Sequence, residues 1–268
     1  MDKLAKAQHE LRQMDELAAG TSVIHRLHPL SKLAVTAAYI ALVVSFPKYD
    51  LTGLVVKLLY PVLAFQLAGL RIRDCFYKLR VVLPLVCAVG LANPFFDRAP
   101  YLYFGSVAVS GGGISMLTLM MKGVFSLMVS FLLIATTRID VLCAALRQLH
   151  VPQLITSLLL LTYRYITVLL GEASAMTTAY RLRAPGQKGL HISAWGSFLG
   201  QLLLRSMDRA QQLYGSMLLR GYRGEFPYCA PPKARIHDVL FSVCSIAAFI
   251  LARAVNIPQV LGALVTGG

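Results

Sequence analysis

Long apolar segments constrain this sequence more than any of its motifs does. Five of them predict membrane-spanning helices, over residues 33–46, 51–70, 81–96, 114–136 and 239–257. A helix needs about 20 apolar residues, and at least about 17, to cross the hydrocarbon core of a bilayer. The first and third segments are shorter than this, so they require tilting, local thinning of the bilayer or burial by neighbouring helices. We therefore expect an all-α, polytopic membrane protein with about five spans.

The composition agrees with a membrane location. Hydrophobic residues make up 57% of the 268 residues and charged residues 14%, whereas soluble domains carry about 25% charged residues. The five cysteines show no spacing typical of a zinc site or of a disulfide framework. No metal site and no cofactor are therefore expected on this chain.

The basic residues predict the orientation in the membrane. Lys and Arg number 26 against 12 Asp and Glu, which gives a net charge of +14. Segments 1–32, 71–80 and 137–236 carry five, four and twelve basic residues, whereas the loops on the other side carry only Lys48 and Arg98. Because cytoplasmic loops are enriched in Lys and Arg, we expect a multi-pass protein of the cell membrane with a cytoplasmic N-terminus. Topology explains the positive charge, so no nucleic-acid partner is required.

Residues 154–170 form a sixth apolar segment, which Arg164 interrupts near its middle. If this segment spanned the membrane, the nine basic residues of 171–236 would lie outside. The positive-inside rule disfavours that arrangement, although long loops obey it less strictly. We therefore predict a buried helix of a cytoplasmic or interfacial domain, with six spans as the alternative.

The predicted organisation has four parts: 1–32, a cytoplasmic N-terminal segment; 33–136, a transmembrane domain of four spans; 137–236, a cytoplasmic helical domain; and 237–268, the final span and tail. One helix of the cytoplasmic domain is expected to end where Pro185 and Gly186 follow it. Another is expected over about residues 193–220, with Gly221 at its C′ position.

Several kinds of catalytic and transport site are absent from the sequence. It contains no G-x-x-x-x-G-K-[ST], H-E-x-x-H or G-x-S-x-G motif, so it has no P-loop for ATP and none of these catalytic sites. None of the five predicted spans contains Asp or Glu. Proton- or ion-driven carriers usually place such groups at membrane depth, so a secondary carrier is disfavoured.

Three basic residues fall inside the predicted spans: Lys57, Lys122 and Arg253. A charge at the centre of a bilayer costs roughly 2.5–3.5 kcal/mol on insertion scales and often marks a functional site. Arg253, near the outer end of its span, is expected to extend its charge to the interface. For Lys57 and Lys122 two interpretations stay open: a functional role, or a structural one such as a hydrogen bond to carbonyls inside the bundle.

Two arginine clusters end the long helices of the predicted cytoplasmic domain. They are residues 179–185 (AYRLRAP) and 217–224 (MLLRGYRG). Arginines near a helix C-terminus complement the macrodipole by about 0.3–1 kcal/mol each, which explains one cluster better than it explains two. Because the guanidinium group pairs well with carboxylates and carbonyls, the clusters predict a docking surface for an acidic cytosolic protein.

These clusters carry a family resemblance that extends over nearly the whole chain. The sequence resembles the transmembrane T component of energy-coupling factor transporters, of the EcfT/CbiQ type and in particular its cobalt-type members. The segments that carry the resemblance are 24–33 (IHRLHPLSKL), 93–97 (NPFFD), 161–165 (LTYRY), 180–186 (YRLRAPG), 205–210 (RSMDRA) and 217–224 (MLLRGYRG).

The resemblance implies two short motifs, commonly Ala-Arg-Gly, at the ends of cytoplasmic coupling helices. It centres the first on Arg183, followed by Ala184, with Arg181 as an alternative centre, and the second on Arg220, followed by Gly221. In the family, these helices sit in grooves of two ATP-binding cassette ATPase subunits. They pass the motion of the ATPases to a substrate-capturing membrane subunit. The resemblance therefore implies that this chain is not an enzyme and that ATP is hydrolysed in the separate ATPase subunits.

The implied function is coupling in an importer, for cobalt, with nickel as the near alternative. Arg205, Asp208 and Arg209 are weaker candidates for this role, either as partner contacts or as intramolecular pairs that orient the second helix. The alternative from another class is an integral membrane enzyme acting on lipid or isoprenoid substrates. Such an enzyme would need clustered acidic residues to hold Mg²⁺, and the sequence shows no such cluster.

Overall fold

The computed structural model describes residues 3–47, 51–80, 82–96, 100–104, 107–183, 186, 190–224 and 235–254. The chain divides into two compact units. The bundle unit consists of Ala19–Thr137 and Pro232–Gly268, and the long-helix unit consists of Met1–Ala18 and Arg138–Pro231. Each unit is described by itself below.

The bundle unit is helical apart from one short hairpin. Its elements in chain order are α2 (Val23–Arg26), α3 (Pro29–Val44), α4 (Leu51–Lys57), α5 (Leu59–Ala68), α6 (Ile72–Leu79), α7 (Leu83–Phe96), β1 (Pro100–Phe104), β2 (Val107–Ser110), α8 (Gly111–Thr136) and α12 (Ile236–Ala254). The two strands pair antiparallel, with Phe104 opposite Val107. The sequence did not predict this hairpin, which lies between the third and fourth predicted spans.

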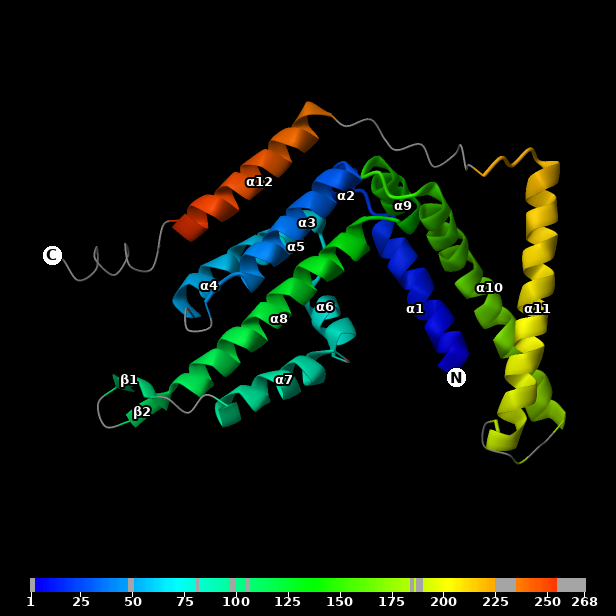
Figure 1. The fold of residues 1–268 in the computed structure, drawn as a ribbon, viewed down its shortest axis with the longest axis horizontal. Coiled ribbons are helices and arrows are strands. Elements are labelled where there is room, and N and C mark those ends of the chain that lie inside the picture. Colours follow the sequence, from blue (N-terminus) through cyan, green and yellow to red (C-terminus); the bar gives the residue numbers. More distant parts are fainter. Residues whose placement is uncertain are drawn as a thin grey trace. The chain divides into compact units, whose positions relative to one another are not determined.

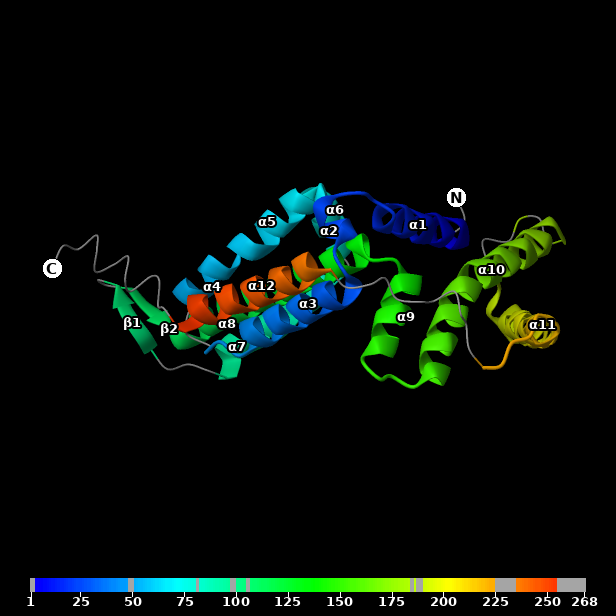
Figure 2. The same ribbon diagram turned by 90° about the horizontal axis from the view of Figure 1, so that it is seen from above.

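Helix α8 packs against most other elements of the bundle unit, and α3 packs against both α8 and α12 (Figures 1 and 2). The core between these helices and α4 contains seven buried side chains: Val35, Tyr39, Val43, Leu54, Phe125, Val129 and Phe249. The ring of Tyr39 lies 5.0 Å from that of Tyr60 and 5.4 Å from that of Phe249. Aromatic packing thus joins segments that are far apart in the sequence.

The second predicted span, 51–70, is a helix with a break rather than one continuous helix. Helix α4 ends at Lys57 and α5 begins at Leu59. Pro61 explains the break, because proline has no backbone N–H to donate to the carbonyl four residues earlier. That carbonyl belongs to Lys57, and it accepts a hydrogen bond from the buried hydroxyl of Tyr39 at 2.9 Å instead.

Two lysines tie α3 and α8 together at opposite ends of the pair. Lys122 of α8 donates to the carbonyl oxygens of Val44 and Phe46 at the C-terminus of α3, at 3.2 and 2.6 Å. Lys32 of α3 donates to the carbonyl oxygen of Thr136, the last residue of α8, at 2.8 Å. Each ammonium group therefore satisfies carbonyls that a helix end leaves without a partner.

The two lysines of the predicted spans thus have structural partners. Besides the bonds of Lys122, the ammonium group of Lys57 lies 3.5 Å from the carbonyl oxygen of Phe249. These contacts match the structural interpretation, in which lysines bond to carbonyls inside the bundle. Arg253 is exposed, as expected for a residue near a helix end.

Three helices are long and apolar enough to cross a membrane, counted over the described residues: Gly112–Thr136, Gln153–Arg183 and Ile236–Arg253. Two shorter apolar helical stretches overlap the first two predicted spans: Pro29–Val44, and Gly53–Ala68, which contains the break after Lys57. The expectation of a helical membrane protein is confirmed. The number of spans stays a prediction.

The long-helix unit consists of α1 (Lys3–Ala18), α9 (Ile139–Gln148), α10 (Gln153–Arg183) and α11 (Ile192–Leu219). Helix α10 packs against α1, α9 and α11, and Tyr163 of α10 donates a hydrogen bond to Asp15 of α1. Helices α9 and α10 form a helical hairpin, whose turn places His150 at a φ of 62°.

The predicted burial of 154–170 is wrong for this chain by itself. Helix α10 buries small residues, among them Thr156, Ser157 and Ala173, against its neighbours. Several of its large aliphatic side chains are exposed, and Leu154 is 72% exposed. Helix α10 runs without a break from Gln153 to Arg183. No other described element packs over its exposed aliphatic side chains.

Candidate functional site

The first arginine cluster lies in the last turn of α10. Arg181 and Arg183 are both exposed there. The side chain of Arg183 has no hydrogen-bond or ion-pair partner among the described residues. Ala184, which the resemblance adds to the motif, lies outside the described residues. The guanidinium group of Arg183 is therefore available to a partner protein at the end of α10.

The second arginine cluster lies at the C-terminus of α11. Arg220 is the C-cap residue, and Gly221 follows it at a φ of 79°, the left-handed conformation predicted for a C′ glycine. The N–H of Tyr222 bonds to the carbonyl of Met217, and that of Gly221 to the carbonyl of Leu218, both at 2.9 Å. These two bonds form a Schellman motif, which fixes the backbone that carries the exposed side chain of Arg220.

The three weaker candidates lie where α11 passes α10. Arg205 forms an ion pair with Glu172 of α10, with 2.9 Å between Nη1 and Oε2. Asp208 and Arg209 line the same recess, a cavity of about 240 Å³. Glu172 was missed as a partner, although it is the only acidic residue of α10 and could have been found on that ground.

Helix α11 has little packing of its own. None of its residues is buried, counting the described part of the chain. The apolar side chains of Leu199, Leu203, Met207 and Tyr214 are all exposed. An ion pair between side chains this exposed contributes about 0–1 kcal/mol. A long apolar helix held so weakly is typical of a surface that a partner covers.

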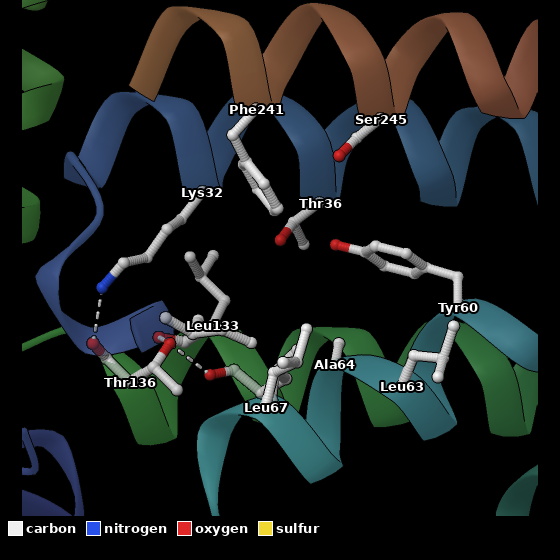
Figure 3. Close-up of a pocket in the computed structure, with 12 residues that line it drawn as sticks. Lys32, Thr36, Tyr60, Leu63, Ala64, Leu67, Leu133, Thr136, Phe241 and Ser245 are labelled. Atoms are coloured by element: carbon white, nitrogen blue, oxygen red, sulfur yellow. Dashed lines mark hydrogen bonds between the residues drawn. The ribbon is translucent and has the colours of Figure 1, made fainter. Parts of the chain in front are cut away.

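The bundle unit contains an apolar cavity of about 190 Å³ between α3, α5, α8 and α12 (Figure 3). Thr36 and Tyr60 direct their hydroxyl groups towards its interior. The ammonium group of Lys32 points to the end of α8 and bonds there to the carbonyl of Thr136. With mostly aliphatic walls, the cavity offers no set of ligands for a metal ion.

The described residues include no group of three or more His, Cys, Asp or Glu side chains that could hold a metal ion. His25 and His28, three residues apart, each have a local partner instead. His25 lies 2.7 Å from the hydroxyl of Ser22, and His28 accepts a bond from the N–H of Leu30 at 3.3 Å. The two histidines therefore form hydrogen bonds that stabilise the turn between α2 and α3.

Comparison of the sequence with known proteins identifies the family of this chain. The family model for the cobalt transport protein CbiQ matches residues 20–228. The cobalt transport protein CbiQ of Rhodobacter capsulatus is 30% identical over 235 residues, which are 86% of this chain and 93% of the relative.

Two further relatives carry the name energy-coupling factor transporter transmembrane protein EcfT. That of Thermosediminibacter oceani is 24% identical over 245 residues, 86% of this chain and 90% of the relative. That of Limosilactobacillus fermentum is 26% identical over 220 residues, 75% of this chain and 80% of the relative. These matches confirm the resemblance drawn from the motifs. The chain therefore belongs to the cobalt transport protein family CbiQ, the same type of transmembrane component as EcfT.

Proposed function

We propose that this chain is the transmembrane coupling subunit of an energy-coupling factor importer for cobalt. The match to cobalt transport proteins over 86% of the chain supports the metal, and the relatives named EcfT support the type of transporter. In this proposal, a separate pair of ATP-binding cassette ATPases hydrolyses ATP, and a second membrane subunit captures the metal. The coupling domain faces the cytoplasm.

One observation carries the coupling role. Two long helices of one unit, α10 and α11, each end in an exposed arginine that has no partner among the described residues. Arg183 and Arg220 would each donate charge-assisted hydrogen bonds to carboxylates or carbonyls of one ATPase subunit. Arg181 is the alternative contact at the end of α10. Closure of the ATPase pair on ATP would then move both helix ends.

The recess between α10 and α11 would hold the two helices at a defined angle. The pair Arg205–Glu172 spans this recess, and Asp208 and Arg209 lie beside it. In this role the pair orients the second helix, and the partner that covers α11 keeps it in place. An enzyme that modifies lipids or isoprenoids is not favoured, because the relatives of this chain named above are transport proteins.

The test is a double substitution, Arg183→Ala with Arg220→Ala, in the assembled transporter. Cobalt uptake should fall to the level without the chain, or the ATPases should no longer co-purify with it. Arg12→Ala, which removes an exposed arginine from α1 of the same unit, serves as the matched control and should leave both measurements unchanged. Normal uptake by the double variant would refute the assignment, and a defect of Arg181→Ala alone would move the first contact to Arg181.

The substrate is tested separately. Uptake of cobalt and of nickel is measured in cells with and without the chain. A loss confined to cobalt supports the proposal, and a loss confined to nickel would replace the metal while leaving the coupling role intact.

A further inference from the structure

The three basic residues of the predicted spans converge on one aromatic residue, Phe46, just beyond the C-terminus of α3. The ammonium group of Lys57 and the guanidinium group of Arg253 each lie 5.6 Å from the centroid of its ring. Lys122 donates to its carbonyl oxygen at 2.6 Å. Helices α4, α8 and α12 therefore bring three positive charges to the end of α3. We call these three residues the Phe46 cation cluster.

No carboxylate neutralises this cluster within the described part of the chain. None of the ion pairs found among those residues includes Lys57, Lys122 or Arg253. Charges inside a membrane protein are usually paired, and here a positive excess is left over.

Exposure differs among the three cations. Lys57 is buried, with 3% of its surface exposed, whereas Lys122 is half-buried and Arg253 is exposed. The buried lysine adds positive potential beneath the ring of Phe46. The other two side chains are accessible to a ligand at the surface of the bundle.

Exposed aliphatic side chains belong to the same helix ends as the accessible cations. Val44 at the end of α3 and Ile250 and Leu251 in the last turns of α12 are largely exposed. On a helix that is apolar enough to cross a membrane, such residues face the acyl chains of lipids. The surface therefore combines a cationic group with an aliphatic flank, which matches the chemistry of a phospholipid.

We propose that the Phe46 cation cluster binds the phosphate group of an anionic phospholipid. The guanidinium group of Arg253 offers the planar fork that binds phosphate oxygens, and Lys122 adds a second donor. The acyl chains would lie along Ile250 and Leu251. Basic sites between transmembrane helices bind anionic headgroups in this manner. The lipid would supply the negative charge that the described residues lack.

Native mass spectrometry of the detergent-purified full chain tests this proposal, with phosphatidylglycerol, phosphatidylcholine and inorganic phosphate as separate probes. Phosphatidylglycerol should be retained in preference to phosphatidylcholine. Arg253→Leu should weaken its binding about fivefold, as loss of ~1 kcal/mol per basic residue implies. Arg253→Lys should restore part of the binding, because it keeps the charge.

Arg73→Leu is the matched control, since Arg73 is an exposed basic residue of α6 in the same unit. It should leave lipid retention unchanged. Equal retention of the two lipids, or an equal loss with Arg73→Leu, would overturn the proposal. Displacement of phosphatidylglycerol by millimolar inorganic phosphate would identify an anion site without lipid recognition and would equally overturn it. None of these outcomes depends on cobalt transport or on ATPase binding.

Discussion

The hydrogen bond from Tyr39 to the carbonyl of Lys57 gives a direct test of how the bundle tolerates a proline. Tyr39 is fully buried, and its hydroxyl lies 2.9 Å from that carbonyl oxygen. Tyr39→Phe removes the donor and keeps the ring, so the packing against Tyr60 and Phe249 is preserved. A buried carbonyl left without a partner costs about 1–3 kcal/mol. The free energy of unfolding should fall by this amount.

The same substitution should be almost harmless when Pro61 is absent. Pro61→Ala supplies a backbone N–H at the position that pairs with the Lys57 carbonyl in a regular helix. In the Pro61→Ala background, Tyr39→Phe should therefore cost less than about 0.5 kcal/mol. The difference between the two backgrounds is the coupling energy of a double-mutant cycle.

Reversible unfolding in mixed detergent micelles, followed by helical circular dichroism, measures these energies. Tyr60→Phe is the matched control, because Tyr60 belongs to the same ring cluster and its hydroxyl points into the cavity (Figure 3). That variant should lose no more than a few tenths of a kcal/mol. An equal loss for Tyr39→Phe with and without Pro61, or a loss no larger than that of Tyr60→Phe, would refute the reasoning.

Three further predictions concern the helix ends and a buried thiol. His150→Gly should stabilise the chain by about 1 kcal/mol in thermal unfolding. His150 has a φ of 62°, and this left-handed conformation costs a non-glycine residue about 1–2 kcal/mol. An unchanged stability of the variant would contradict the prediction. Gly221→Ala should destabilise the end of α11 for the same reason, with Gly221→Asn in between, as measured by amide hydrogen exchange. Burial raises the pKa of the Cys75 thiol from 9.0 to about 11, so at neutral pH its maleimide reaction should be about 100-fold slower than that of an unperturbed thiol and should speed up about tenfold per pH unit until the pKa is reached. Rapid labelling of Cys75 in the native chain would contradict its burial.

Much of the fold follows from patterns that are local in the sequence. The apolar run 114–136 became the long helix α8, and Gly221 ends α11 as its position predicted. The break after Lys57 was missed because prolines are tolerated inside membrane helices. Only the position of Tyr39, which bonds to the carbonyl of Lys57, shows how Pro61 is accommodated. The hairpin β1–β2 was missed because two short strands carry little periodicity.

Long-range partners set the limit for the site as well. The sequence identified the arginines at the ends of α10 and α11, since helix termini leave local signals. It did not identify Glu172 as the partner of Arg205, because the two residues are 33 positions apart. The apolar face of 154–170 was assigned to a core, whereas the described residues leave several of its large side chains exposed. Hydrophobic pattern shows that a face avoids water and does not show what covers it.

The lysine bonds at the two ends of α3 and α8 restrict how this part of the protein can move. Lys32 bonds to Thr136 and Thr137 at one end, and Lys122 bonds to Val44 and Phe46 at the other. Sliding one helix past the other by a single turn, about 5.4 Å, would break all four bonds. The pair should therefore travel as one rigid body, so that conformational change occurs at its borders. A covalent cross-link between α3 and α8 would then be compatible with every step of a working cycle.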